Sequence, residues 1–217
     1  MSHTLRGMAL ALALALVTAG TARSAEAQYP TASKGDVAID RLNAEKLRAG
    51  MRKLWADHVI WTREYIANAI EEDGSADAAA ARLMKNQEDI GNAIVPYYGK
   101  EAGAKLTGLL KEHITIATQV VGAAKAKDNT KLADADKRWK SNATDIATFL
   151  SGANPNWPKT ELVKMLNEHL SLTTQEATAR LEKNWTADVA AFDKIFDQAM
   201  HMADALTDGI VKQFPNK

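Results

Sequence analysis

Histidine recurs in this sequence at positions where a helical pattern calls for an aliphatic residue. The segments LLKEHITIATQ and MLNEHLSLTTQ each carry a Glu-His pair within an apolar seam, and their histidines are His113 and His169. His58 takes the same place in ADHVIWTRE, and His201 lies in the last helical segment. Neutral imidazoles can ligate a transition metal, and beside carboxylates they can act as general acid and base.

Other polar residues keep the same interval. Asp89, Asp145 and His201 occupy equivalent positions in three segments, 56 residues apart. Three further sets recur with them. An acid directly precedes each of the first three histidines. An amide lies three residues before Asp89, Asp145 and His201, and a basic residue lies one helical turn before each amide. Their members are Asp57, Glu112, Glu168, Asn86, Asn142, Gln198, Arg82, Arg138 and Lys194.

The elements that carry these residues are helices. Apolar residues recur every three or four positions, the pattern of amphipathic helices packed on one another. Equivalent positions return three times at about 55 residues, which indicates an internal repeat. Turn signals such as EEDGSAD, and breaks such as VPYYGKEAG, divide the chain into helical hairpins at about 42–95, 100–150 and 158–213. We therefore predict an all-α, six-helix bundle of three repeated antiparallel hairpins about a pseudo-threefold axis.

Hairpin geometry predicts that the polar positions share one height. His58 lies about 15 residues before the first tip and Asp89 about 15 after it, so each is roughly 22 Å from the tip at a rise of 1.5 Å per residue. The same count pairs His113 with Asp145, and His169 with His201. Because the three tips should point the same way, we expect these six side chains to form one layer in the middle of the bundle.

Three interpretations of this layer stay open. The first, which we prefer, is a transition-metal site for buffering, transport or sensing, because imidazole and carboxylate without thiolate suit Zn, Cu, Ni, Mn or Fe. The four histidines, Asp89 and Asp145 would be ligands, and the nine residues that keep the same interval would orient them or bind a ligand. The second is a structural or partner-binding layer that fixes helix register.

The third interpretation is a small-ligand or hydrolytic pocket, in which Arg82 and Arg138 could hold an anion. No Ser-His-Asp or Cys-His arrangement, phosphate loop or dinucleotide motif accompanies the histidines. An enzyme is therefore the less favoured interpretation, and no catalytic residue is assigned.

The first residues predict export. Arg6 precedes an apolar run from Met8 to Val17, and Ala25-Glu26-Ala27 is a small-x-small cleavage site. We expect a signal peptide over 1–27, cleaved after Ala27, and a periplasmic or secreted protein. Residues 28–39 read as a flexible lead-in and 40–217 as a single helical domain without a transmembrane segment.

Composition narrows the partners. The chain has 27 basic and 27 acidic residues and no cysteine. A balanced charge of mixed sign argues against nucleic acid as a partner, and the lack of cysteine excludes disulfides and thiolate metal sites. A metal ion or small ligand is the expected partner, and the sequence does not identify a protein partner.

Several blocks of the sequence resemble a family of exported bacterial all-helical proteins whose function is uncharacterised. They are NQEDIGNAIVPYYG, LLKEHITIATQ, NATDIATFL and MADALTDGIVKQFP, and the resemblance covers about residues 45–215. Members of that family are sometimes labelled glycosyltransferases. This sequence has neither the βαβ pattern nor the Asp-x-Asp motif that such an activity requires, so the resemblance implies a helical fold and export but no site residues.

Overall fold

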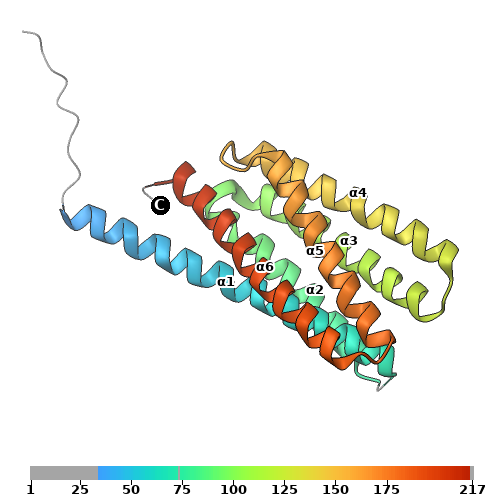
Figure 1. The fold of residues 1–217 in the computed structure, drawn as a ribbon. Coiled ribbons are helices and arrows are strands. Elements are labelled where there is room, and N and C mark those ends of the chain that lie inside the picture. The colour runs from blue at the N-terminus through green and yellow to red at the C-terminus, as the bar shows by residue number, and fades with distance from the viewer. Residues whose placement is uncertain (1–33, 73, 216–217) are drawn as a thin grey trace, which may run out of the picture. The chain divides into compact units, whose positions relative to one another are not determined.

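The computed structural model describes residues 34–72 and 74–215, which form six helices and no strand (Figure 1). In chain order they are α1 (Lys34–Glu71), α2 (Ala76–Ala93), α3 (Val95–Lys125), α4 (Asn129–Ala153), α5 (Lys159–Leu181) and α6 (Trp185–Gln213). The predicted all-α class and six-helix bundle are confirmed. The signal peptide expected over 1–27 lies outside the described residues.

The helices form a closed ring. Each helix packs mainly against its neighbours in the chain, and α6 returns to pack along α1, as Figure 1 shows. The pairs α1/α2, α3/α4 and α5/α6 are joined by short turns and lie side by side, as expected for hairpins. A ring of this kind buries the apolar seam of every helix against one shared core.

In each of the three hairpins, the first helix is followed by a residue in the left-handed backbone conformation. Glu72, Lys127 and Lys183 have φ values of 61, 55 and 58°, and they are the non-glycine residues with positive φ in the described part of the chain. The amides of Asp128 and Asn184 then donate back to carbonyls of the preceding helix at 3.0 and 2.8 Å. This arrangement is the Schellman motif, which satisfies carbonyls that a helix end leaves free.

At the opposite end the chain is broken by glycine and proline, as predicted. Gly99 interrupts α3 with a φ of 86°, a conformation that glycine adopts without strain. Pro96 stands in the first turn before this break, where a missing N–H costs no helical hydrogen bond. Residues 154–158 separate α4 from α5. These breaks let successive hairpins lie next to one another.

The prediction of a flexible lead-in over residues 28–39 is wrong for its second half. Helix α1 begins at Lys34, so residues 34–39 are helical. The last proline of the lead-in is Pro30, and nothing after it prevents a helix. Gly35 falls in the first helical turn, where the cost of glycine is smaller than in a helix interior.

Close packing at the end of the bundle opposite the hairpin turns depends on one glycine. Trp157 is buried and donates from Nε1 to the carbonyl of Ala205 at 3.3 Å. Its indole lies against Gly209 of α6, where a Cβ would come within 1.9 Å of Nε1. Absence of a side chain at Gly209 therefore makes room for Trp157.

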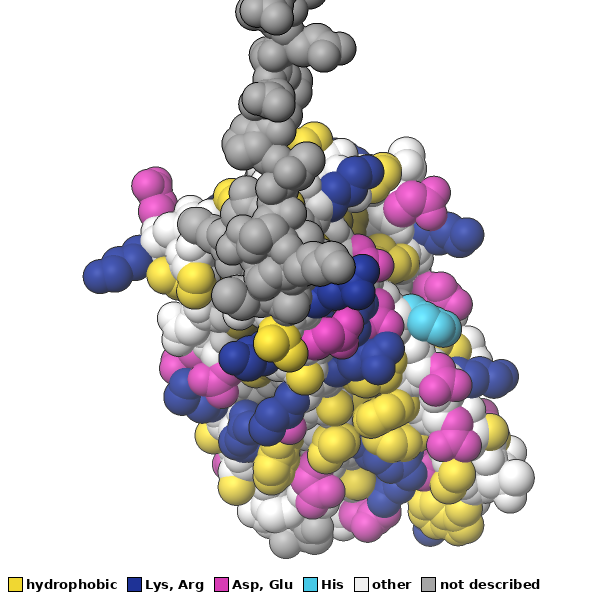
Figure 2. Space-filling view, turned by 90° about the vertical axis from the view of Figure 1, so that its left-hand side faces the viewer, with side chains coloured by type: hydrophobic (Ala, Val, Ile, Leu, Met, Phe, Trp, Pro, Cys, Tyr) yellow, Lys and Arg dark blue, Asp and Glu magenta, His cyan; other side chains and the backbone are white. Residues whose placement is uncertain are grey.

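The surface carries both signs of charge. Figure 2 shows basic and acidic side chains interspersed on one face, with hydrophobic side chains between them. Several charges pair across the α1–α6 interface, where Arg52 contacts Asp204 at 2.5 Å and Arg48 contacts Asp204 at 3.2 Å. Exposed pairs of this kind contribute little to stability.

Candidate functional site

Three of the four predicted histidines meet in the core. His58 on α1, His113 on α3 and His169 on α5 are 4–5% exposed. The ring centroids of His58 and His169 are 5.6 Å apart, and all three side chains line one core cavity of about 30 Å³. The sequence therefore predicted this part of the layer.

Side-chain amides from the paired helices hold two of these imidazoles. His113 Nδ1 lies 2.8 Å from Asn142 Oδ1, and His169 Nδ1 lies 3.1 Å from Gln198 Oε1. The nitrogens of the same two amides donate to backbone carbonyls of the first helix at 3.1 and 2.9 Å. Because this fixes each amide oxygen toward the ring, Nδ1 must be the protonated nitrogen of both histidines.

His58 has a different partner. Asn86 donates to the carbonyl of Leu54 at 2.9 Å, as its counterparts do in the other hairpins. The neighbouring Gln87, however, places Nε2 3.2 Å from His58 Nδ1, and this nitrogen also donates to the carbonyl of Leu83 at 2.8 Å. An amide nitrogen can only donate, so His58 Nδ1 accepts and its proton lies on Nε2. Gln87 lies outside the repeated polar positions, so no spacing in the sequence indicated its role.

A tryptophan occupies the other side of His113. Trp139 Nε1 donates to His113 Nε2 at 3.0 Å, so both ring nitrogens of His113 are hydrogen-bonded. The Nε2 atoms of His58 and His169 have no hydrogen-bond partner among the described residues. Trp139 lies three residues before Asn142, on the same helix face, and this spacing is the signal that could have indicated its role.

The other half of the predicted layer is not brought together. His201 and Asp145 are exposed, and Asp89 is half-buried and contacts Lys85 at 2.5 Å. The prediction that these three residues face the core is wrong. They lie three residues after the amides that do face it, and three helical residues turn by about 300°, which moves the side chain one level along and about 60° around the helix. The mid-bundle layer thus consists of histidines and amides, without carboxylates.

The flanking acids and bases remain at the surface. Asp57 contacts Lys53 at 2.7 Å and Arg82 at 3.2 Å, and Arg138 contacts Asp134 at 2.9 Å. The remaining three of these predicted residues are exposed: Glu112, Glu168 and Lys194. Among the described residues, none of these six forms a hydrogen bond with a histidine of the layer. Of the predicted amides, Asn142 and Gln198 hold an imidazole directly, whereas Asn86 bonds the carbonyl of Leu54.

Burial keeps the three imidazoles neutral. Loss of hydration lowers the pKa of His113 to about 4, although Asn142 favours the charged form. Burial also lowers the pKa of His169, and it lowers that of His58 well below its usual value, with a further decrease from the neighbouring histidines. A charged group is costly in a low-dielectric core. Neutral imidazole is also the form that ligates metals.

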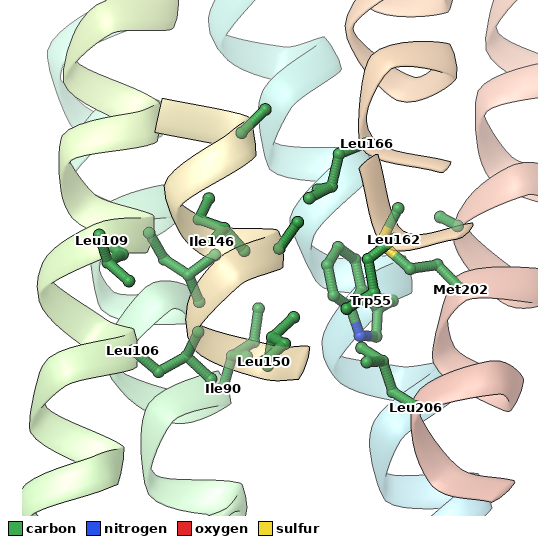
Figure 3. Close-up of a cluster of buried hydrophobic side chains, with 14 of the residues drawn as sticks. Trp55, Ile90, Leu106, Leu109, Ile146, Leu150, Leu162, Leu166, Met202 and Leu206 are labelled. Carbon is green, nitrogen blue, oxygen red and sulfur yellow. The ribbon is translucent and has the colours of Figure 1, made fainter. Parts of the chain in front are cut away.

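A second core cavity lies on the other side of the histidine layer, among the aliphatic and aromatic side chains drawn in Figure 3. Its volume is also about 30 Å³. Each of the two cavities has room for about one water molecule or one ion, so neither can take an organic substrate. Among the described residues, no three or more His, Cys, Asp or Glu side chains are already placed to hold a metal.

The core also contains a buried cluster of charged side chains that no sequence pattern indicated. Glu176 and Asp188 are 1% and 2% exposed and share Arg63, at 2.5 and 2.8 Å. Arg180 bridges Asp188 to Glu71 at 3.0 and 2.6 Å. Burial raises the pKa of Glu176 to about 7, against the opposing effect of Arg63. These residues come from α1, α5 and α6, so the cluster closes the ring between the ends of the chain.

Comparison with known proteins gives no relative: no family model, curated protein or solved structure matches this chain. None of the described helices is long and apolar enough to cross a membrane. The fold and the site therefore define a six-helix bundle with a buried histidine–amide layer, and its function must be inferred from that layer.

Proposed function

We propose that this protein binds one transition-metal ion at the histidine layer, with His58 and His169 as its first two ligands and His113 as a third. The observation that supports this is the meeting of three neutral imidazoles from three helices around one cavity of ionic size. In metal sites, the second ring nitrogen of a histidine is normally held by a hydrogen-bonding partner. The amides of Asn142 and Gln198 do this for His113 and His169.

The spacing of the His58 and His169 rings suits a shared ion. A metal–nitrogen bond is about 2.0–2.1 Å long, so two rings on one ion have centroids about 5–6 Å apart. The observed value for His58 and His169 is 5.6 Å. Without carboxylates nearby, such a site favours Cu or Zn over Mn and Fe, whose preferred ligands include oxygen.

Two rearrangements complete the site. His58 must move its proton from Nε2 to Nδ1. The oxygen of Gln87, which is buried without a partner among the described residues, can accept that proton's hydrogen bond once the amide rotates. His113 becomes a ligand when Trp139 Nε1 leaves its Nε2. Both steps cost hydrogen bonds, and the metal–nitrogen bonds would offset them.

A structural role is the second candidate, because both nitrogens of His113 are already hydrogen-bonded. In this alternative the layer only fixes the register of the paired helices. The amides of Asn142 and Gln198, each of which bonds both an imidazole and a backbone carbonyl of the facing helix, would give it that effect. The two candidates differ in whether metal is taken up.

We also infer that the three hairpins are copies of one unit. The inference is supported by the spacing of His58, His113 and His169, and by the three positive-φ residues, each 14 residues after its histidine. Signal-peptide cleavage after Ala27 and residence in the periplasm or outside the cell belong to the same proposal, where the protein would buffer, carry or sense metal.

Metal titration of the purified protein tests the proposed site. Elemental analysis and calorimetry with Zn, Cu, Ni, Mn and Fe(II) should show about one equivalent bound by nitrogen ligands. A His58→Gln/His169→Gln variant should lose it, while His201→Gln, which changes an exposed histidine outside the layer, should bind as the natural chain does. Equal uptake by the double variant, or no uptake by the natural chain, would leave the structural role.

A further inference from the structure

The second core cavity has a lining that the proposed function does not use. Three methionines from three helices take part in it: Met51 on α1, Met165 on α5 and Met202 on α6. Figure 3 shows Met202 reaching from α6 toward Trp55 and Leu162. Met51 and Met165 precede His58 and His169 by seven and four residues, so this cavity lies one to two helical turns from the histidine layer.

The donor atoms in this cavity are thioether sulfurs. All its other lining side chains are aliphatic or tryptophan, and no carboxylate, imidazole or carbonyl-bearing side chain takes part. Trp55 Nε1 is buried there without a hydrogen-bond partner in the described part of the chain, but an indole N–H is a donor only and cannot ligate a cation. Thioether sulfur is a soft ligand that selects Cu(I), whereas hard cations require oxygen.

We propose that Met51, Met165 and Met202 bind a single cuprous ion. A singly charged soft ion is the cation least penalised by an apolar environment that offers only sulfur. Trp55 also lines this cavity, and an aromatic face beside the ion would add a favourable cation–π contribution. The cavity of about 30 Å³ holds one ion but no organic molecule.

The position of Met165 offers the ion a route from the surface to the cavity. Met51 and Met202 are 2% and 3% exposed, whereas Met165 is half-buried and so reaches both the cavity and the surface of α5. Because methionine has three rotatable bonds, Met165 can bind an ion at the surface and carry it inward by a change of rotamer. This site rests on different side chains from the histidine site, so either proposal can hold without the other.

Cu(I) binding by the natural chain and four variants tests this site. Cu(I) is titrated in reductant against a chromophoric chelator, and X-ray absorption at the copper edge identifies the ligand atoms. The natural chain should bind Cu(I) with sulfur at about 2.3 Å, close to a zinc–sulfur bond length. A Met51→Leu/Met165→Leu/Met202→Leu variant should bind at least about 100-fold more weakly, since loss of ligands costs more than loss of their supporting residues. Leucine conserves the methionine volume, so the fold should be kept, which circular dichroism checks.

Two controls separate the sites. Met84→Leu changes a half-buried methionine that lines neither cavity, and His58→Gln/His169→Gln removes the nitrogen ligands. Both should keep sulfur-ligated Cu(I). If the triple leucine variant binds Cu(I) as tightly as the natural chain, or the absorption spectrum of the natural chain shows nitrogen ligands alone, the thioether site is refuted. The single variant Met202→Leu repeats the comparison with the smallest change and should weaken sulfur-ligated binding in the same direction.

Discussion

Trp139 Nε1 donates to His113 Nε2 over 3.0 Å, across the interface between α3 and α4. While this bond is made, His113 cannot ligate a metal through Nε2, the ring nitrogen that faces away from Asn142. Trp55 offers a contrast: its ring meets His58 edge-on with centroids 5.5 Å apart, but its Nε1 is buried without a hydrogen-bond partner among the described residues.

Replacing each tryptophan by phenylalanine should therefore have different effects. Both changes remove the same volume, but Trp139→Phe leaves His113 Nε2 unsatisfied, whereas Trp55→Phe removes an N–H that already lacks a partner. We expect Trp139→Phe to lower the free energy of unfolding by about 1–3 kcal/mol more than Trp55→Phe. Chemical denaturation of the metal-free proteins measures this difference.

The same pair of variants bears on the proposed metal site. Trp139→Phe frees His113 Nε2 and should tighten metal binding while it destabilises the metal-free fold. Trp55→Phe leaves the three imidazoles as they are and serves as the control for ring removal. A Trp139→Phe protein that is both as stable as Trp55→Phe and unchanged in metal affinity would contradict the role assigned to this hydrogen bond.

Periodicity explains why the sequence predicted the three buried histidines but wrongly placed Asp89, Asp145 and His201 beside them. His58, His113 and His169 stand in apolar seams, so the buried face of each helix could be predicted from spacing alone. The second helices carry polar residues on two neighbouring faces, Asn142 and Asp145 being an example. Spacing alone does not reveal which of two such faces is turned inward, because a rotation of about 60° exchanges them.

The ionic cluster could not be predicted for another reason. Arg63 lies 113 residues from Glu176 and 125 from Asp188, so these charges are far apart in the sequence. Their contact exists because α6 closes the ring against α1. Such a contact depends on the complete fold, and no local pattern indicates it.

Acid should destabilise the metal-free protein through the histidine layer. The pKa of His113 is about 4 in the fold and 6.5 in the unfolded chain, so below pH 6.5 the unfolded chain binds a proton that the fold does not. His113 therefore adds about 3 kcal/mol to the free energy of unfolding above pH 6.5. This contribution is lost as the pH falls from 6.5 to 4. His58 and His169, whose pKa values are also lowered, add in the same direction.

Glu176 opposes this loss over part of the same range. Its pKa is about 7 in the fold and 4.5 in the unfolded chain, so its contribution is complete below pH 4.5 and is lost as the pH rises through 7. That contribution is also about 3 kcal/mol. We expect Glu176→Gln to remove it and to steepen the loss of stability between pH 6.5 and 4.5.

Unfolding curves in denaturant at several pH values between 4.5 and 6.5 check this expectation. The control is His113→Gln in the Glu176→Gln background, which should reduce the slope again because one titrating imidazole is gone. A Glu176→Gln profile no steeper than that of the natural chain would show that Glu176 does not hold its proton in the fold.

The hairpin turns offer a prediction in which stability increases. Lys127 and Lys183 are exposed residues with φ values of 55 and 58°, in the left-handed region that costs a non-glycine residue about 1–2 kcal/mol. Lys127→Gly and Lys183→Gly relieve this strain, although glycine also increases the entropy of the unfolded chain. Each should raise the free energy of unfolding by about 0.5–1 kcal/mol.

Lys137→Gly, at an exposed position inside α4, is the control and should lower the free energy of unfolding by about 1 kcal/mol. Thermal and denaturant unfolding of the three variants measures these changes, and a loss of stability in both turn variants would mean that the lysines are not strained there.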